Sequence, residues 1–78
     1  MINISYEITE PEGLHSLPAT ALVKQLNTLK SDILASCKGQ MVDAKSMFGL
    51  MSLGAKYKDV IVFTANGEDE QKLFDILY

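Results

Sequence analysis

Hydrophobic and polar residues alternate with a period of two at the start of the chain, over residues 2–8. Such alternation is typical of a strand with one buried and one solvated face. Glu10-Pro11-Glu12-Gly13 interrupts the pattern and predicts a turn. From about Ser16 the apolar residues recur at steps of three and four, which predicts a helix with one face toward the core. The members of this apolar stripe are Ala19, Leu22, Val23, Leu26 and Leu29.

Three more strands are expected in the rest of the chain. Residues 32–37 and 40–43 flank Lys38-Gly39, a pair that is typical of a hairpin turn. The β-branched and aromatic run at residues 60–63 predicts the fourth strand.

Two short helices complete the predicted pattern. Ser46 is a good N-cap and Gly54 a good C-terminal stop, so we expect a helix between them. The last helix is expected to open with the carboxylates of residues 68–70 and to bury three apolar side chains, Leu73, Phe74 and Leu77. The order of elements is βαββαβα. It predicts an α+β fold, an open-faced two-layer sandwich with a four-stranded antiparallel sheet covered on one face by three helices. With 78 residues, one domain over positions 1–78 is expected.

Composition and charge exclude several classes of function. Seven lysines stand against ten carboxylates, which gives a formal charge of −3, and the chain contains no arginine. Because nucleic-acid-binding domains normally carry a basic, arginine-bearing stripe, no nucleic-acid partner is expected. No apolar run approaches the roughly 20 residues that cross a membrane, so no membrane insertion is expected. The alternating N-terminus also lacks the plan of a signal peptide.

Cys37 and His15 are each the only residue of their type. A single cysteine cannot build an intramolecular disulfide framework, which favours a cytoplasmic location. One cysteine and one histidine cannot supply a structural zinc ligand set, so neither a metal nor another cofactor is expected. We expect Cys37, at the end of a strand, to be a small buried side chain rather than a reactive thiol.

His15 directly precedes the expected first helix. The first turn of a helix leaves backbone N–H groups unpaired, and the aligned peptide dipoles add partial positive charge there. This field disfavours imidazolium and therefore biases His15 toward its neutral, nucleophilic form at about pH 7. The N–H groups of Ser16 and Leu17 would suit a phosphoryl group attached to the ring. From spacing alone, a histidine that only caps the helix or lies on the surface is the simpler interpretation.

Three blocks of the sequence carry a resemblance to a known family. The first is Gly13-Leu14-His15 with Pro18-Ala19 after two residues, the second is residues 44–54, and the third is residues 67–71. In this order and spacing they resemble the histidine-containing phosphocarrier protein (HPr) family of the bacterial phosphotransferase system. The resemblance covers nearly the whole chain, and the family's α+β sandwich agrees with the element order above.

The resemblance implies a phosphoryl relay protein rather than a stand-alone catalyst. His15 would accept a phosphoryl group at Nδ1 from the general phosphotransferase enzyme, which phosphoenolpyruvate charges. It would then pass the group to sugar-specific transporter subunits. The resemblance further implies a monomer with a regulatory phosphorylation site at Ser46, and with a serine kinase and a transcriptional regulator as further partners. Ser46 also has a purely structural interpretation as an N-cap.

Position 17 departs from the family pattern, because Leu17 replaces an arginine that ordinarily accompanies the phosphoryl group. No other arginine can substitute for it, so we expect slower or partner-restricted transfer rather than total loss. Leu17, Met47, Phe48 and Met51 are expected to form an apolar docking face for partner proteins. Because Met47, Phe48 and Met51 come from one short helix, they would otherwise be interpreted as core.

A second hypothesis keeps the docking face without the phosphoryl chemistry. The chain would then be an HPr-like regulatory docking protein controlled by phosphorylation at Ser46, with His15 weakly or not phosphorylated. A hydrolase that uses His15 as a base is the weakest hypothesis, since the sequence shows no nucleophile–base–orienter set. The last helix ends at Tyr78, which is short for the family and should lower stability.

Overall fold

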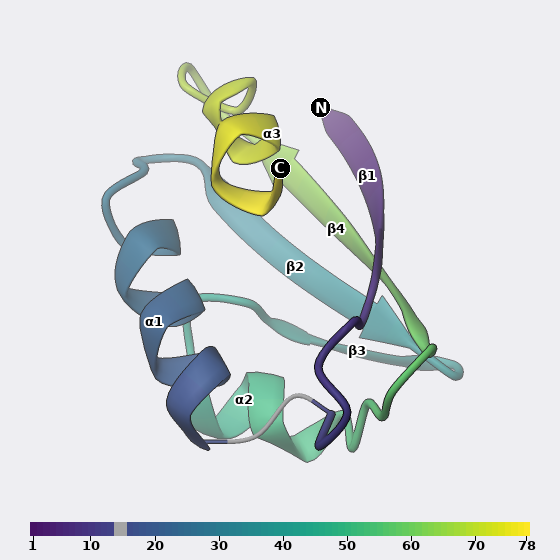
Figure 1. Ribbon diagram of the computed structural model, residues 1–78. Coiled ribbons are helices and arrows are strands. Elements are labelled where there is room, and N and C mark those ends of the chain that lie inside the picture. Colours follow the sequence, from purple (N-terminus) through teal and green to yellow (C-terminus); the bar gives the residue numbers. More distant parts are fainter. Residues whose placement is uncertain (14–15) are drawn as a thin grey trace.

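The computed structural model describes residues 1–13 and 16–78, with the backbone alone described for residues 16–18. In these residues the chain forms a four-stranded sheet and three helices (Figure 1). In chain order the elements are β1 (Ile2–Glu7), α1 (Ser16–Leu26), β2 (Asp32–Cys37), β3 (Gln40–Asp43), α2 (Met47–Ser52), β4 (Val60–Asn66) and α3 (Lys72–Leu77). The predicted α+β class and element order are confirmed. None of the helices in the described part of the chain has the length and apolar character needed to cross a membrane.

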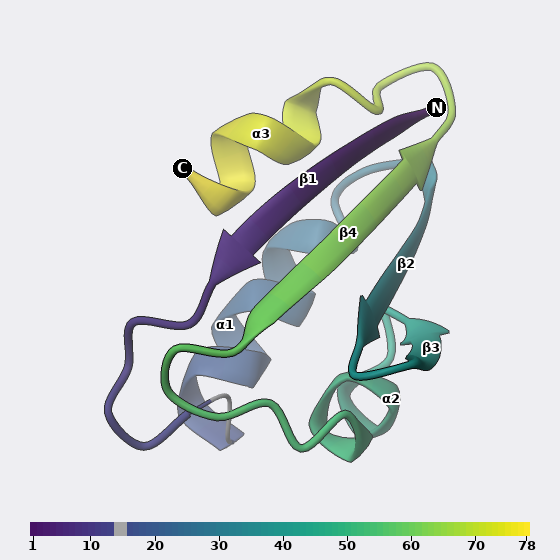
Figure 2. The ribbon, with the colours of Figure 1, turned by 90° about the vertical axis from the view of Figure 1, so that its right-hand side faces the viewer.

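The strands lie in the order β1-β4-β2-β3, and every neighbouring pair is antiparallel (Figure 2). In the β4 strand Phe63 is paired with Ile4 of β1 on one side and with Ala35 of β2 on the other. Paired residues share a face of the sheet, and Phe63 and Ala35 are fully buried. Leu34 and Val60 point to the opposite face and are exposed. One face of the sheet is therefore covered, and Figure 1 shows α1 and α3 on that side.

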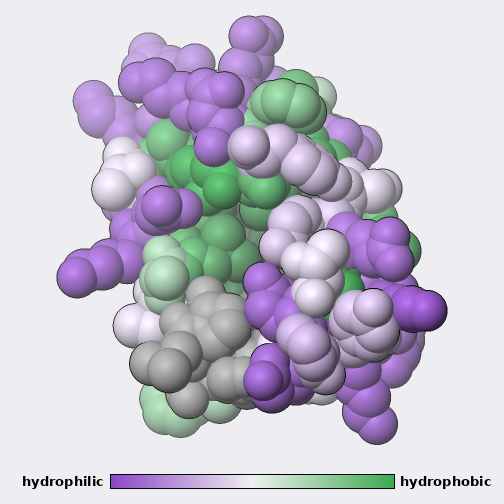
Figure 3. All heavy atoms as spheres, in the orientation of Figure 1, coloured by the Kyte–Doolittle hydropathy of each residue, from purple (hydrophilic) through white to green (hydrophobic). Residues whose placement is uncertain are grey.

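The apolar stripe of α1 packs on the covered face of the sheet, as its spacing predicts. Ala19 and Leu26 are fully buried, and Leu22 and Val23 are half-buried against the core. Leu29 lies beyond the last residue of α1 but is still buried. In the space-filling view, hydrophobic atoms are visible between α1 and α3 with hydrophilic residues around them (Figure 3). The helical layer thus covers the sheet and leaves some hydrophobic residues visible between α1 and α3.

The start of the last helix differs from the prediction, because residues 68–70 form turns and α3 begins only at Lys72. Two carboxylates of this segment, those of Asp69 and Glu70, bind backbone groups instead of leading a helix. Asp69 accepts hydrogen bonds from the N–H of Lys30 at 2.8 Å and from the N–H and hydroxyl of Ser31 at 3.0 and 2.5 Å. Glu70 accepts from the Gly67 N–H at 3.0 Å. These contacts hold residues 67–70 in a turn and connect this turn to the loop between α1 and β2.

The prediction for the apolar face of the last helix is right at two positions and wrong at one. Leu73 and Leu77 are buried, whereas Phe74 is exposed. The ring of Phe74 stacks on that of Tyr78, with 5.2 Å between centroids, at the surface of α3. Phe74 therefore contributes to an aromatic pair at the surface and not to the core. Cys37, in contrast, is buried as expected.

Candidate functional site

The predicted phosphoryl acceptor, His15, lies outside the described residues, as does Leu14. The residues on both sides are described, and they define what surrounds this segment. Gly13 precedes it, and α1 begins at Ser16, the residue that follows the histidine. The expected position of His15 next to a helix start therefore agrees with where α1 begins.

The first turn of α1 offers unpaired backbone donors. The N–H groups at the start of a helix have no partner inside it, and here Ser16 and Leu17 supply them while Pro18 supplies none. The helix dipole adds partial positive charge at the same end. No acidic residue lies in this first turn. The amino end of α1 is thus suited to an anion, as the sequence predicts.

Gly13 fastens the segment before the histidine to the loop between α2 and β4. The residue is buried and has a φ of +82°, which other residue types adopt only at a cost. A Cβ at this position would lie 2.9 Å from the carbonyl oxygen of Ala55 and 3.1 Å from the Cα of Lys56. Only glycine allows the two backbones to approach so closely. Residues 55 and 56 consequently border the chain just before His15.

The same loop is also joined to the end of β1 by the backbone. Ile8 donates its N–H to the Asp59 carbonyl at 2.9 Å and accepts from the Lys58 N–H at 2.9 Å. The Asp59 carboxylate binds the Lys56 N–H at 2.8 Å and the Lys38 ammonium at 2.9 Å. These contacts lower the pKa of Asp59 below its ordinary value, the Lys56 N–H being the largest cause. The loop is therefore joined both to the end of β1 and to the β2–β3 turn.

Helix α2 packs beside α1, the helix that begins directly after His15. Ser46 is its N-cap, as predicted, and the Ser46 hydroxyl accepts a hydrogen bond from the Gly49 N–H at 3.1 Å. Met47, the first residue of α2, accepts a weak hydrogen bond at its sulfur from the Thr20 hydroxyl of α1, at 3.5 Å. This contact places the beginning of α2 beside the amino-terminal half of α1.

The apolar residues of α2 are divided between surface and core. Phe48 is 89% exposed and Met51 is 40% exposed, while Met47 is half-buried. Leu50 is fully buried and anchors the helix. Phe48 and Met51 therefore belong to the surface of α2 and not to the core. The side chain of Leu17, the fourth predicted member of the docking face, is not among those described.

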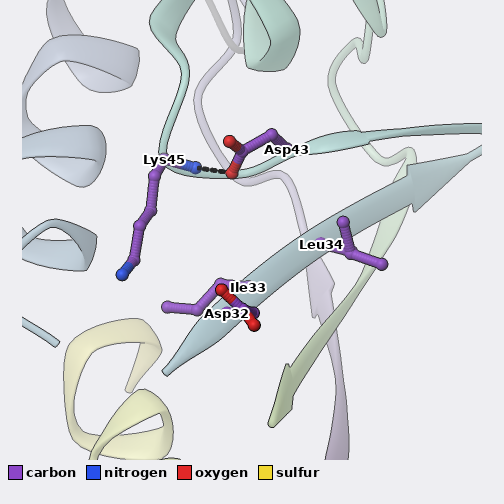
Figure 4. A pocket seen from close by; sticks show the side chains of 5 residues that line it. All are labelled: Asp32, Ile33, Leu34, Asp43 and Lys45. Carbon is purple, nitrogen blue, oxygen red and sulfur yellow. Dashed lines mark hydrogen bonds between the residues drawn. The ribbon is translucent and has the colours of Figure 1, made fainter. Parts of the chain in front are cut away.

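A separate hollow of about 400 Å³ lies at the other end of α1, between β2 and β3 (Figure 4). Its lining residues are Asp32, Ile33, Leu34, Asp43 and Lys45. Two of its charged groups serve the fold, because the Lys45 ammonium donates to the Leu29 carbonyl at 2.6 Å and Asp43 accepts from the Lys45 N–H at 2.9 Å. Across residues 1–13 and 16–78, no group of three His, Cys, Asp or Glu side chains could hold a metal ion.

Two features of the structure could not be found by sequence reasoning. The approach of Gly13 to Ala55 and Lys56 joins residues more than 40 positions apart in the chain, and no local pattern signals it. The anchoring role of Asp69 was missed as well. The only signal for it was its place in a block, residues 67–71, that resembles the HPr family.

Comparison with known proteins agrees with this geometry. A family model described as "PTS HPr component phosphorylation site" matches residues 2–78. The chain is 38% identical over 77 residues to phosphocarrier protein HPr from Buchnera aphidicola subsp. Acyrthosiphon pisum, covering 99% of this chain and 91% of that one. It is 35% identical over 77 residues, with the same coverage, to the HPr-like protein Crh from Bacillus subtilis.

A solved structure also has a similar fold. The crystal structure of HPr-C-His from Thermoanaerobacter tengcongensis superposes with a TM-score of 0.93 at 34% identity, covering 99% of this chain and 86% of that one. The sequence match extends over almost every residue, and the sheet order and helices agree. The chain therefore belongs to the HPr family of phosphocarrier proteins of the phosphotransferase system.

Proposed function

We propose that this chain relays a phosphoryl group on His15, from the phosphoenolpyruvate-dependent general phosphotransferase enzyme to sugar-specific transporter subunits. The observation that carries the proposal is the start of α1 at Ser16, directly after the only histidine of a chain in the HPr family. Backbone donors at that helix end would bind the phosphoryl oxygens. We further propose that the protein works in the cytoplasm as a single copy.

The chemistry requires a neutral imidazole with its proton on Nε2. The lone pair of Nδ1 then forms a bond to phosphorus while the bond between phosphorus and the donor breaks, and that electron pair leaves with the donor. Transfer to the acceptor repeats the step in reverse, so the chain ends unchanged. The positive field at the start of α1 favours the neutral imidazole over imidazolium and also the charge of the phosphoryl group.

Leu17 is expected to make this relay slower than usual for the family. An arginine at this position would bind a phosphoryl oxygen through a charge-assisted hydrogen bond, which leucine cannot form. The backbone N–H groups of Ser16 and Leu17 remain as donors. We therefore propose a competent but slow or partner-restricted carrier.

The docking partner is expected to contact α2 beside the acceptor. Phe48 and Met51 project from this helix into solvent, and α2 contacts α1 through Met47 and Thr20. A partner that covers Phe48 would remove its ring from water next to the phosphoryl group. Leu17 would extend the same apolar surface.

A test of the proposed relay uses phosphoenolpyruvate, the general phosphotransferase enzyme and intact-mass measurement at neutral pH. We expect one acid-labile phosphoryl adduct in the unaltered chain and none in His15→Ala. Ser46→Ala serves as the matched control and should still accept the group. Failure to form the adduct with several homologous donor enzymes would contradict the proposal.

The second candidate function is an HPr-like regulatory docking protein that phosphorylation at Ser46 controls. It is favoured by the cap geometry, because the Ser46 oxygen accepts from Gly49 and an esterified oxygen still would. The added charge would lie two residues from the exposed Phe48, where it would repel acidic partners. Binding of this chain to a partner without transfer, abolished by Ser46→Asp and unaffected by His15→Ala, would favour this function over the relay.

A further inference from the structure

The face of the sheet away from α1 carries several apolar side chains in contact with water. An antiparallel sheet that has one covered face normally presents polar residues on the other. Figure 2 shows this open face, with β1 and β4 in front of α1. Leu34, Met41 and Val60 are exposed on it, and Val62 is half-buried. Ser36 is paired with Val62 on one side and with Met41 on the other, so these side chains share the open face.

The charged side chains of the four strands are all carboxylates, and all of them point to the same open face. Glu7 is paired with Val60, Asp43 is paired with Leu34, and Asp32 precedes Leu34 by two positions. Paired residues, and residues two positions apart in a strand, share a face. The three carboxylates are exposed, and the ion pairs found in the described part of the chain use other carboxylates. They are therefore available to a cationic partner.

Apolar and acidic positions occupy different strands of the open face. Three of the four apolar residues, Leu34, Val60 and Val62, lie on the central strands β2 and β4. Glu7 lies on β1 and Asp43 on β3, which are the edge strands. Neighbouring strands are about 4.8 Å apart, and a helix with its side chains is about 10 Å wide. A helix along β4 and β2 would therefore cover the apolar residues and bring its flanks to the carboxylates.

The hollow described above opens beside Leu34 and offers a place for a basic side chain. Asp32, Leu34 and Asp43 are among its lining residues (Figure 4), and its volume of about 400 Å³ is many times the roughly 30 Å³ of one water molecule. Lys45 also lines it, but the Lys45 ammonium is bound to the Leu29 carbonyl at 2.6 Å. Two carboxylates thus stand against one ammonium that already has a partner, and the hollow favours a cation.

The charge of the open face argues against a second copy of this chain as its occupant. Two copies packed face to face would bring the carboxylates of both together, and like charges repel. The chain has a formal charge of −3 and no arginine to offset that repulsion. A membrane surface of anionic lipids is disfavoured for the same reason.

We propose that the open face of the sheet is a docking surface for a basic amphipathic helix of a partner protein. The apolar stripe of that helix would lie on β4 and β2, and its lysine or arginine side chains would lie over the carboxylates of the edge strands. One of these side chains would enter the hollow and bind Asp32 and Asp43. The surface consists of strand residues on the side away from α1, so the inference does not depend on the proposed relay.

The test uses a synthetic helical peptide whose leucine stripe is flanked by arginines. A peptide with glutamate in place of each arginine is the control for charge. We expect the arginine peptide to bind about ten-fold tighter than the glutamate peptide. The NMR amide signals that shift on binding should belong to β2, β3 and β4 and not to α2.

Two pairs of charge substitutions locate the binding on the protein. Asp32→Asn combined with Asp43→Asn should weaken binding of the arginine peptide about five-fold, because two ion pairs are lost. The matched control, Glu68→Gln combined with Asp75→Asn, removes the same charge from exposed residues outside the sheet and should stay within about two-fold.

The apolar contribution is measured with Met41→Ser combined with Val60→Thr. Both residues are exposed, so the fold should persist, and circular dichroism checks it. We expect about five-fold weaker binding, since less apolar surface is removed from water.

Several results would overturn the inference. They are the absence of binding at about 1 mM peptide, equal affinity for the glutamate peptide, and equal losses in the carboxylate variant and its matched control. Amide shifts centred on α2 would assign the peptide to the other exposed apolar surface. Sedimentation of the unaltered chain as a dimer that Met41→Ser with Val60→Thr disrupts would make a second copy the occupant and contradict the proposal.

Discussion

Gly13 illustrates how one residue can join two backbone segments that are distant in the chain. Its positive φ and its contact with the Ala55 carbonyl are two separate demands for glycine. Gly39, in the β2–β3 hairpin, has the same φ of +82° but no atom within 4 Å of its Cβ position. Gly39 is therefore required only for its backbone conformation, whereas Gly13 is required for its conformation and for its close contact with Ala55.

We expect Gly13→Ala to destabilise the fold more than Gly39→Ala does. The left-handed backbone costs either variant roughly 1–2 kcal/mol, and the clash with Ala55 adds about 1–3 kcal/mol at position 13 alone. Denaturant unfolding of both variants measures the difference. Equal losses of stability would mean that the contact between Gly13 and the α2–β4 loop is not tight.

Leu17→Arg should accelerate phosphoryl transfer from the general phosphotransferase enzyme. A charge-assisted hydrogen bond to the phosphoryl group contributes roughly 1.5 kcal/mol or more, which corresponds to about a ten-fold higher rate. Quenched-flow transfer assays measure the rate, with Leu17→Met as the control for side-chain size. Unchanged or slower transfer in Leu17→Arg would show that Leu17 is not what limits this chain.

At the scale of elements, α2 combines a buried anchoring face and an exposed apolar face within six residues. Leu50 is fully buried, whereas Phe48 is almost fully exposed two positions earlier. The Ser46 cap and the Leu50 anchor keep the helix in place, so the exposed ring is presented on a rigid support.

Phe48→Ala should therefore affect docking and not folding. We expect its free energy of unfolding to stay within about 0.5 kcal/mol of the unaltered chain, because an exposed ring contributes little to the core. The KM of the general phosphotransferase enzyme for this chain should rise about ten-fold, as for truncation of an aromatic anchor. Leu50→Ala is the contrasting variant and should lose about 2–5 kcal/mol of stability. An unchanged KM in Phe48→Ala would place the docking face elsewhere.

At the scale of the whole molecule, two carboxylates join segments that are distant in the chain. Asp69 binds the loop between α1 and β2 through Lys30 and Ser31. Glu70 forms an ion pair with the N-terminal amine at 2.8 Å. The Ser31 hydroxyl lowers the pKa of Asp69 to about 2, with the Lys30 N–H next in weight. The N-terminal amine is the main cause of the lowered pKa of Glu70.

These pKa values predict acid-sensitive stability. A carboxyl whose pKa is lower in the folded than in the unfolded chain stabilises the fold at pH above its ordinary value. For Asp69 this contribution should be complete above its ordinary 3.8 and be lost as the pH falls toward about 2. Unfolding measured between these two pH values should show the loss, and Asp69→Asn should flatten it. The same slope in Asp69→Asn would assign the acid sensitivity to other carboxyls.

The element order of this chain could be predicted from its sequence because periodicity reports local structure directly. Alternation at residues 2–8, the stripe of α1 and the Lys38-Gly39 turn each depend on neighbours in the chain, and each prediction is confirmed. The apolar spacing also identified part of the core, including Leu26, Leu29, Leu73 and Leu77. It failed at Phe74, because periodicity cannot tell a buried ring from one that stacks on Tyr78 at the surface.

By itself, the sequence determined the fold class, the single histidine with its helix on the carboxyl side, and the absence of arginine. Only the tertiary structure decided that residues 68–70 form turns, with the Asp69 carboxylate bound to backbone groups far away in the chain. It also decided that Phe48 faces solvent and that Lys56 lies against Gly13. The physical reason is the same in each case. Local patterns fix which faces must be buried, whereas packing between distant segments fixes which groups meet.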